Sequence, residues 1–190
     1  MKYELLKKEF GRYASWACWD SNDINILPDD HTPKKPQYMF VGLNASQAED
    51  GRIWGNFHYR HRGGKDGNLR DAIMGTEFEG AYLTDILKYP NEPIAHRVRS
   101  HFKKHPDELK QHFDVFYKEI TLLEDVDCMF VFGKDAQHFV EQFMKYMGND
   151  VKMRRIKVIP LVHYSAPKMY KRGAYREHLL NVIEALQLGM

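Results

Sequence analysis

Apolar and polar positions alternate along the chain in a way that separates short buried strands from amphipathic helices. Four short runs of apolar residues are bounded by polar or turn-forming residues, and we expect each to form a strand. Runs this short and this apolar are typical of strands that are covered on both faces. The four predicted strands are QYMFVG at 37–42, GAYLTDIL at 80–87, DCMFVFG at 127–133 and RIKVIPLV at 155–162.

Apolar residues at helical spacing occupy most of the chain between these strands. Leu6, Phe10 and Tyr13 predict an opening helix over residues 3–19, within the first 20 residues of the chain. A helix that begins near Pro106 has acidic residues in its first turn, where they suit the helix dipole. Further helices are predicted at 68–74, after the third strand through Ala136, Phe139, Val140, Phe143 and Met147, and at 174–188.

Strands that alternate with helices predict a parallel sheet with helices on both faces. We therefore expect an α/β fold, a three-layer α/β/α sandwich around a four-stranded, mostly parallel sheet. Two segments, 45–67 and 89–105, show no clear period and are predicted to be loops. The first is longer than compact domains usually carry without a functional reason.

Length and composition predict one domain over residues 1–190, with its core at 37–190. The chain has 43% hydrophobic and 13% aromatic residues, which is ample for a core. Cys18 and Cys128 lie far apart and are expected to be reduced thiols, too few to hold an iron–sulfur cluster. No apolar run suits a signal peptide or a membrane span, so a cytoplasmic protein with no membrane partner is expected.

The net charge of +2 is too small to indicate nucleic-acid binding by bulk charge, so a site for a polyanion must come from local clustering. Such a cluster follows the fourth strand, where a histidine and a hydroxyl are succeeded by cations. Since ligands of parallel sheets bind beyond the carboxyl ends of the strands, the residues at all four strand ends predict a polar site. They include Gly42, Leu43, Asn44, Ser46, Asp85, Lys88, Gly133, Lys134, His163, Ser165, Lys168, Lys171 and Arg172.

The motifs at the first and last strand ends resemble those of the uracil-DNA glycosylase superfamily. VGLNAS at 41–46 is similar to the Gly-x-Asn-Pro or Gly-x-Asp-Pro element of that superfamily, and VHYSAP at 162–167 to its His-Pro-Ser-Pro element. Between them, IWGNFHYRHRGGKDGNLRDAI resembles the segment that carries a stacking Phe, and AYLTDILKYP a strand of the iron–sulfur branch. The resemblance extends over roughly residues 37 to 170. Ala45 and Tyr164 depart from it, because the superfamily usually has Pro there.

The resemblance implies a DNA glycosylase-like fold and a metal-independent, cofactor-independent hydrolysis of an N-glycosidic bond. Asn44 would orient the attacking water, His163 would stabilise an oxygen of the departing base, and Phe57 would stack on the flipped base. The partner would be single- or double-stranded DNA that carries a lesion, bound by a monomer. Gly42 and Leu43 would line the base pocket, and Ser46, Ser165, Lys168, Lys171 and Arg172 would hold the DNA backbone.

Asp85 stands where the iron–sulfur branch has Asn. An amide both donates and accepts hydrogen bonds, whereas an ionised carboxylate only accepts and would repel the uracil carbonyl unless protonated. Asp85 is therefore better matched to a base edge with donors: guanine, hypoxanthine, xanthine, cytosine or adenine.

Each residue also has an ordinary structural interpretation. Asn44 suits a turn, and His163 suits the end of a strand. Phe57 and Trp54 could anchor a loop to the core, and Asp85 could cap a helix or pair with Lys88. The basic run at 96–105 suits a solvated basic face, and His58, His61 and the nearby Asp66 lack the third well-spaced ligand that a metal site needs.

Three hypotheses follow for the function. The first is a glycosylase that hydrolyses the bond to a flipped base. The second is a catalytically inactive member of the same fold that binds nucleic acid, a nucleobase or a nucleotide. The third is an unrelated α/β enzyme for a small molecule.

Overall fold

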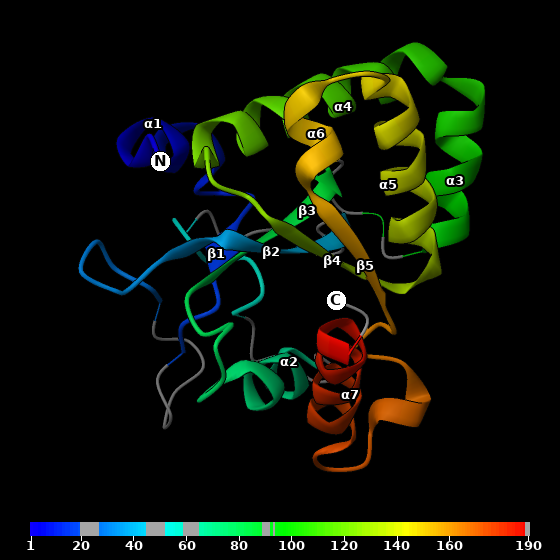
Figure 1. Ribbon diagram of the computed structural model, residues 1–190. Helices are drawn as coiled ribbons and strands as arrows, with labels where there is room; N and C mark the ends of the chain where they lie inside the picture. The colour runs from blue at the N-terminus through cyan, green and yellow to red at the C-terminus, as the bar shows by residue number, and fades with distance from the viewer. Residues whose placement is uncertain (20–26, 45–51, 59–64, 89–91, 93, 189–190) are drawn as a thin grey trace.

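The computed structural model describes residues 1–19, 27–44, 52–58, 65–88, 92 and 94–188. They form three layers, with a central sheet between two layers of helices (Figure 1). The α/β/α sandwich predicted from the sequence is thereby confirmed.

The central sheet contains five strands among the described residues: β1 (Ser15–Trp16), β2 (Lys35–Asn44), β3 (Ala81–Leu87), β4 (Cys128–Phe132) and β5 (Lys157–Leu161). Their order is β1-β3-β2-β4-β5. The last four pair in parallel, and β1 lies antiparallel to β3 at one edge. The prediction of four strands was therefore wrong by this one edge strand. Two residues are too few to show an alternating pattern.

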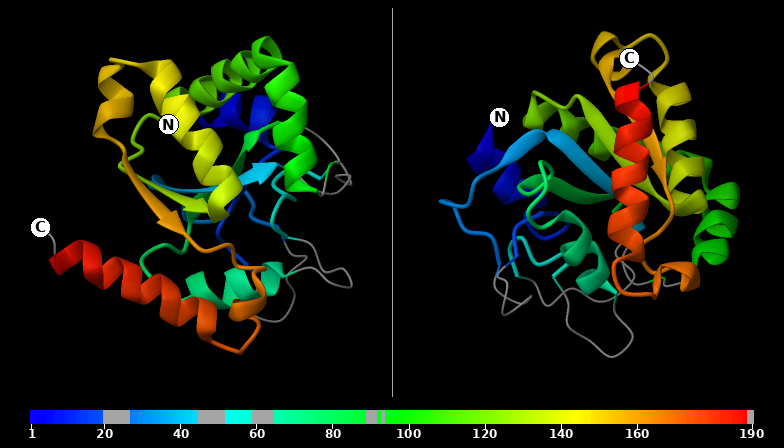
Figure 2. Two further views of the ribbon diagram at one scale, coloured as in Figure 1. Left: turned by 90° about the vertical axis from the view of Figure 1, so that its right-hand side faces the viewer. Right: turned by 60° about the horizontal axis from the view of Figure 1, so that its bottom comes forward.

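Helices cover the two faces of the sheet unequally (Figures 1 and 2). One face carries α1, α3, α4, α5 and α6, and the other carries α2 and α7. A 3₁₀ turn, η1 (Pro167–Met169), leads from β5 toward α7. The helices are α1 (Tyr3–Phe10), α2 (Asp66–Ile73), α3 (Ala95–Lys104), α4 (Pro106–Leu123), α5 (Gly133–Met147), α6 (Val151–Arg155) and α7 (Ala174–Leu188).

Successive residues of β2 contribute to two separate hydrophobic cores. Met39 and Val41 are fully buried in the core beneath α4 and α5, whereas Phe40 is buried in the core beneath α2 and α7. Side chains of a strand alternate between faces, so a continuous apolar run fills both cores at once. This is why β2, β3 and β4 lack polar alternation, whereas β5 at the sheet edge buries only Ile159 and Leu161.

Three predictions about element boundaries differ from the structure in ways that change an element. The opening helix ends at Phe10 rather than near residue 19, and the chain then turns into β1. The predicted loop at 89–105 contains α3, whose buried side chains are Val98 and Phe102. Two apolar residues among many basic ones give too weak a stripe to indicate a helix. The fourth predicted strand begins later than expected, because α6 occupies its first residue, Arg155.

Candidate functional site

The candidate site lies at the carboxyl ends of the four parallel strands. In the order of the sheet, β2 connects onward to β3 toward one edge, whereas the adjacent strand β4 connects onward to β5 toward the other edge. Adjacent parallel strands whose connections diverge in this way open a crevice that commonly binds ligands. The ends of β2 and β4 carry Asn44 and Phe132, with Gly133 beginning α5.

Asp85 lies against the backbone of Gly42, its register partner on the adjacent strand. A Cβ at residue 42 would overlap Asp85 Oδ1 and would lie 3.5 Å from Phe57 Cζ. Glycine is therefore required there for the carboxylate to approach the strand. Asp85 is 5% exposed, and its Oδ2 accepts a hydrogen bond of 2.9 Å from Asn56 Nδ2. Burial raises the pKa of Asp85 to about 6, against the lowering effect of the Asn56 bond and of Lys88.

Phe57 is held beside this carboxylate in an unusual backbone conformation. Its φ is +64°, a value that side-chain-bearing residues rarely adopt. Its N–H donates to Asn56 Oδ1 at 3.1 Å, and its carbonyl accepts from Trp19 Nε1 at 3.3 Å. The ring packs 6.4 Å from that of Phe132. These contacts fix a conformation that would otherwise be unfavourable, as is common at functional sites.

His163 follows β5 and packs against Phe132 at the same strand ends. Its ring lies 6.0 Å from the Phe132 ring and stacks 4.5 Å from that of Tyr164. Gly133 lies against it, because a Cβ there would be 3.2 Å from His163 Cβ. Phe132 thus lies near the rings of both Phe57 and His163.

The protonation of His163 follows from its contacts. Ser165 N donates to Nδ1 at 3.1 Å, and Ser165 Oγ lies 2.8 Å from the same atom. A backbone N–H can only donate, so Nδ1 carries no proton and the neutral ring is protonated at Nε2. Burial lowers the pKa of His163 to about 4, so the ring stays neutral at physiological pH.

The remaining predicted pocket residues lie around β2. Asn44 ends the strand, and its Nδ2 donates to Glu92 O at 3.0 Å. Leu43 packs partly buried against the core under α4 and α5. Ser46 lies outside the described residues, so its predicted contact with DNA stays a prediction.

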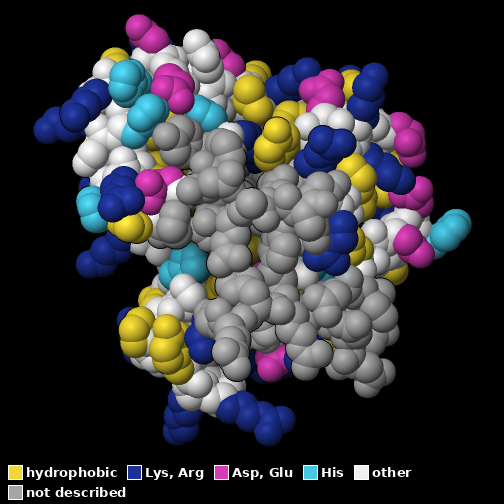
Figure 3. Space-filling view, turned by 180° about the vertical axis from the view of Figure 1, so that it is seen from behind, with side chains coloured by type: hydrophobic (Ala, Val, Ile, Leu, Met, Phe, Trp, Pro, Cys, Tyr) yellow, Lys and Arg dark blue, Asp and Glu magenta, His cyan; other side chains and the backbone are white. Residues whose placement is uncertain are grey.

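The predicted cationic cluster lies on the exposed segment between β5 and α7. Lys168 is in η1, and Lys171 and Arg172 precede α7. The last two help to line a cavity of about 150 Å³ together with Arg176 and the buried Tyr175. Elsewhere, the described Lys and Arg side chains of the face in Figure 3 are spread out with Asp and Glu among them, in keeping with the small net charge.

A comparison with protein families matches residues 28–187 to the family described as the uracil DNA glycosylase superfamily. The chain belongs to the uracil DNA glycosylase superfamily. The resemblance proposed from the motifs is therefore confirmed, and it extends beyond the segment that the motifs covered. A comparison with curated proteins gives no match.

Within this superfamily member, several ordinary interpretations of the sequence can now be judged. Trp54 is a loop anchor, because it is 1% exposed and its ring lies 5.9 Å from that of Trp16. The basic run is the solvated face of α3. Asp85 neither caps a helix nor pairs with Lys88 through its carboxylate, since Lys88 Nζ lies 2.7 Å from Glu119 Oε2 instead.

The described residues contain no group of three His, Cys, Asp or Glu side chains that could hold a metal ion. His58, one of the three residues considered as metal ligands from the sequence, is fully buried, and its Nε2 lies 3.2 Å from Trp16 O. Asp66 accepts from Tyr164 OH at 3.2 Å, and His61 lies outside the described residues. Among the described helices, none is long and apolar enough to cross a membrane.

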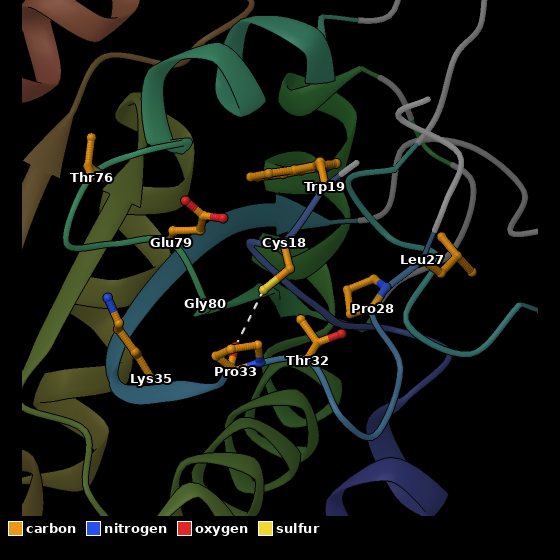
Figure 4. A pocket seen from close by; sticks show the side chains of 10 residues that line it. All are labelled: Cys18, Trp19, Leu27, Pro28, Thr32, Pro33, Lys35, Thr76, Glu79 and Gly80. Atoms are coloured by element: carbon orange, nitrogen blue, oxygen red, sulfur yellow. Dashed lines mark hydrogen bonds between the residues drawn. The ribbon is translucent and has the colours of Figure 1, made fainter. Parts of the chain in front are cut away.

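A second cavity, of about 460 Å³, lies at the opposite, amino end of the strands, where Lys35 begins β2 and Gly80 precedes β3 (Figure 4). Its polar side chains bond to nearby backbone: Lys35 Nζ donates to Glu77 O at 2.7 Å, and a Glu79 oxygen accepts from Gly75 N at 2.8 Å. The Cys18 thiol points into it and lies 3.5 Å from Pro33 O.

Sequence reasoning missed two residues that shape the candidate site: Asn56, which bonds Asp85, and Phe132, whose ring lies near those of Phe57 and His163. It named Ser165 as a contact to the DNA backbone but did not predict that Ser165 N fixes the tautomer of His163. The position of Phe132 at the end of a predicted strand was a usable signal. For Asn56 there was none, since its partners are distant in sequence.

Proposed function

We propose that this protein is a DNA glycosylase-like enzyme that hydrolyses the N-glycosidic bond of a damaged or deaminated base flipped out of DNA. The observation that carries the proposal is the state of His163: a neutral, partly buried imidazole with its proton on Nε2, close to Phe132 at the strand ends. Membership of the uracil DNA glycosylase superfamily supports the same reaction class.

In the proposed reaction, water attacks the sugar carbon as the bond to the base breaks, and the base leaves with negative charge on an exocyclic carbonyl oxygen. The proton that the water loses ends on the released base or in solvent. The Nε2–H of His163 donates a hydrogen bond to that oxygen. A buried neutral donor stabilises developing charge well because it needs no rearrangement at the moment of reaction. A charged imidazolium is not required, which agrees with the lowered pKa of His163.

Asn44 orients the attacking water in this proposal. Its Nδ2 donates to Glu92 O, and this bond fixes which way the amide faces. The amide accepts a hydrogen bond from water but cannot remove a proton. Hydrolysis through an oxocarbenium-like state depends more on a placed water and a stabilised leaving base than on a strong base.

Phe57 stacks on the flipped base beside Asp85, and the cations hold the DNA backbone. Lys171 and Arg172 border a cavity large enough for a phosphate group, and Lys168 is exposed nearby. Phosphate contacts of this kind position the strand without reading its sequence. The predicted contact of Ser165 with phosphate stays part of the proposal. In the structure, the hydroxyl of Ser165 lies 2.8 Å from His163 Nδ1.

The decisive experiment measures base release from oligonucleotides that carry one uracil, hypoxanthine, xanthine or mismatched base, in single and double strands. His163→Ala should lower the rate by about 10²- to 10³-fold, because one donor to the leaving oxygen is lost. His163→Gln should retain part of the rate, since its amide can still donate. His105→Ala, at an exposed histidine that ends α3, is the control and should leave the rate unchanged.

A second candidate is a non-catalytic member of the superfamily that binds nucleic acid. It is favoured by Asn44, which stands where a carboxylate could otherwise act as a base, and by Phe57, which is only 6% exposed. Measurable DNA binding without release of any base, in wild type as in His163→Ala, would support this candidate and overturn the enzymatic proposal.

A further inference from the structure

The side chain of Asn56 joins three segments of the chain at the candidate site. Its Nδ2 donates to Asp85 Oδ2 at 2.9 Å and to Tyr13 O at 2.8 Å, and its Oδ1 accepts from Phe57 N at 3.1 Å. Two acceptors around Nδ2 and one donor at Oδ1 are compatible with a single orientation of the amide. Asn56 is 8% exposed, so these bonds form away from bulk water.

The two oxygens of Asp85 are consequently not equivalent. Oδ2 is held by the Asn56 amide, whereas Oδ1 lies against Gly42 near the tip of the Phe57 ring. Because Oδ2 must accept from Asn56, any proton that Asp85 takes up resides on Oδ1. The atom beside the ring proposed to stack on the base is therefore Oδ1.

We propose that Asn56 is a specificity-determining residue that selects which atom of residue 85 faces the base. With aspartate at that position, and resting on the glycosylase function proposed above, the pocket accepts bases that present an N–H donor to Oδ1. An ionised carboxylate cannot donate, so a base that presents a carbonyl there meets an oxygen of like charge. Sites built around one buried hydrogen bond reject ligands that lack the partner strongly.

Substitutions separate the role of residue 56 from that of residue 85. In Asp85→Asn, the Asn56 Nδ2 still requires an acceptor, so the new amide turns its oxygen to Asn56 and its NH₂ to the base. In the double variant Asn56→Asp/Asp85→Asn, the carboxylate at residue 56 accepts from the NH₂ at residue 85. The amide oxygen then faces the base. The same side chain at residue 85 thus presents a donor in the single variant and an acceptor in the double variant.

The test ranks four bases, each placed at one position of the same oligonucleotide: uracil, cytosine, hypoxanthine and adenine. Base release and equilibrium binding by fluorescence anisotropy are measured at pH 7.5 for the wild type and both variants. Asp85→Asn should shift the preference toward bases that present a carbonyl, by about tenfold or more. The double variant should return to the ranking of the wild type.

A double variant that ranks the bases as Asp85→Asn does would overturn the role of Asn56. If the wild type releases no base, the proposed enzymatic function fails, and the ranking by binding affinity still decides the role of Asn56. The double variant loses the bond to Tyr13 O, so its fold is checked by circular dichroism. Asn56→Ala/Asp85→Asn is the further variant: its amide is free to turn over, and the preference between carbonyl and amine bases should fall to near one.

Discussion

The buried carboxylates of Glu119 and Asp85 lie on opposite faces of β3, and the groups that surround them differ in polarity and charge. Glu119 of α4 is fully buried, and its Oε1 accepts from Tyr82 OH at 2.8 Å and from Thr84 Oγ1 at 2.9 Å. Its Oε2 lies 2.7 Å from Lys88 Nζ. Asp85, on the other face of β3, has one hydrogen bond from a neutral amide to its carboxylate among the described contacts.

The difference separates a carboxylate that holds the fold together from one that is available for a ligand. Buried charge is costly unless it is paired and hydrogen-bonded, and Glu119 has both kinds of partner. Asp85 keeps an oxygen beside Gly42 and Phe57, and burial raises its pKa to about 6. A perturbed, incompletely compensated group near the carboxyl end of a parallel strand is a common property of binding sites.

The largest effect is expected from Lys88→Ala, which would leave Glu119 buried without its cation. The free energy of unfolding should fall by about 3–5 kcal/mol, as for other broken buried pairs. Chemical denaturation followed by circular dichroism measures it. The control is Lys110→Ala, which removes the exposed pair with Asp107 and should have no measurable effect. Equal effects of the two substitutions would mean that Glu119 is not held in the way described.

Asp85→Asn, in contrast, should raise the free energy of unfolding at neutral pH. The raised pKa means that the folded state binds this proton more tightly than the unfolded chain, so stability falls as pH rises from about 4 through 6. The substitution removes this loss and should raise the free energy of unfolding at pH 7.5 by up to about 3 kcal/mol, at about 1.4 kcal/mol per pKa unit. The wild type and the Asp85→Asn variant share the charged neighbours of residue 85, which are Lys88, Glu119 and Asp66.

Denaturation curves from pH 4 to pH 8 measure this effect. The gain from Asp85→Asn should shrink as the pH falls from 6 and become small near pH 4, where the wild-type carboxyl group is neutral in the folded state and about half protonated in the unfolded chain. A gain that is constant across this range would show that burial of the charge is not its cause.

A smaller effect, about 1–3 kcal/mol of destabilisation, is expected from Gly42→Ala, because the added methyl group would overlap Asp85 Oδ1. The same substitution in an Asp85→Ala background should cost much less, since the colliding atom is gone. A double-mutant cycle measures this coupling by thermal denaturation. Additive effects would show that the carboxylate does not lie against residue 42.

Much of the fold could be predicted from the sequence because its apolar pattern is dense. The stripes of α4 and α5 are long enough to show a helical period, and the apolar runs of β2–β5 are dense enough to indicate buried strands. The positions of Asp85 and His163 near strand ends followed from the topology. The family motifs then indicated the reaction class. Short elements gave no comparable signal: β1 has two residues, and α3 buries two apolar side chains.

The electrostatic character of the site could not be predicted in the same way. It depends on contacts between residues far apart in sequence, as in the bonds that connect Tyr13, Asn56 and Asp85. The sequence indicated that a carboxylate stands at residue 85, but not that one of its oxygens is already engaged. Likewise, the tautomer of His163 depends on how the next turn places Ser165 N.

The two edges of the sheet bear on how this chain behaves at high concentration. Edge strands expose unpaired backbone groups to which a strand of another molecule can add. Here β1 is only two residues long, and β5 carries Pro160, which has no N–H to offer an incoming strand. Both edges are therefore poor templates for intermolecular β-pairing, which favours resistance to aggregation while the sheet is folded.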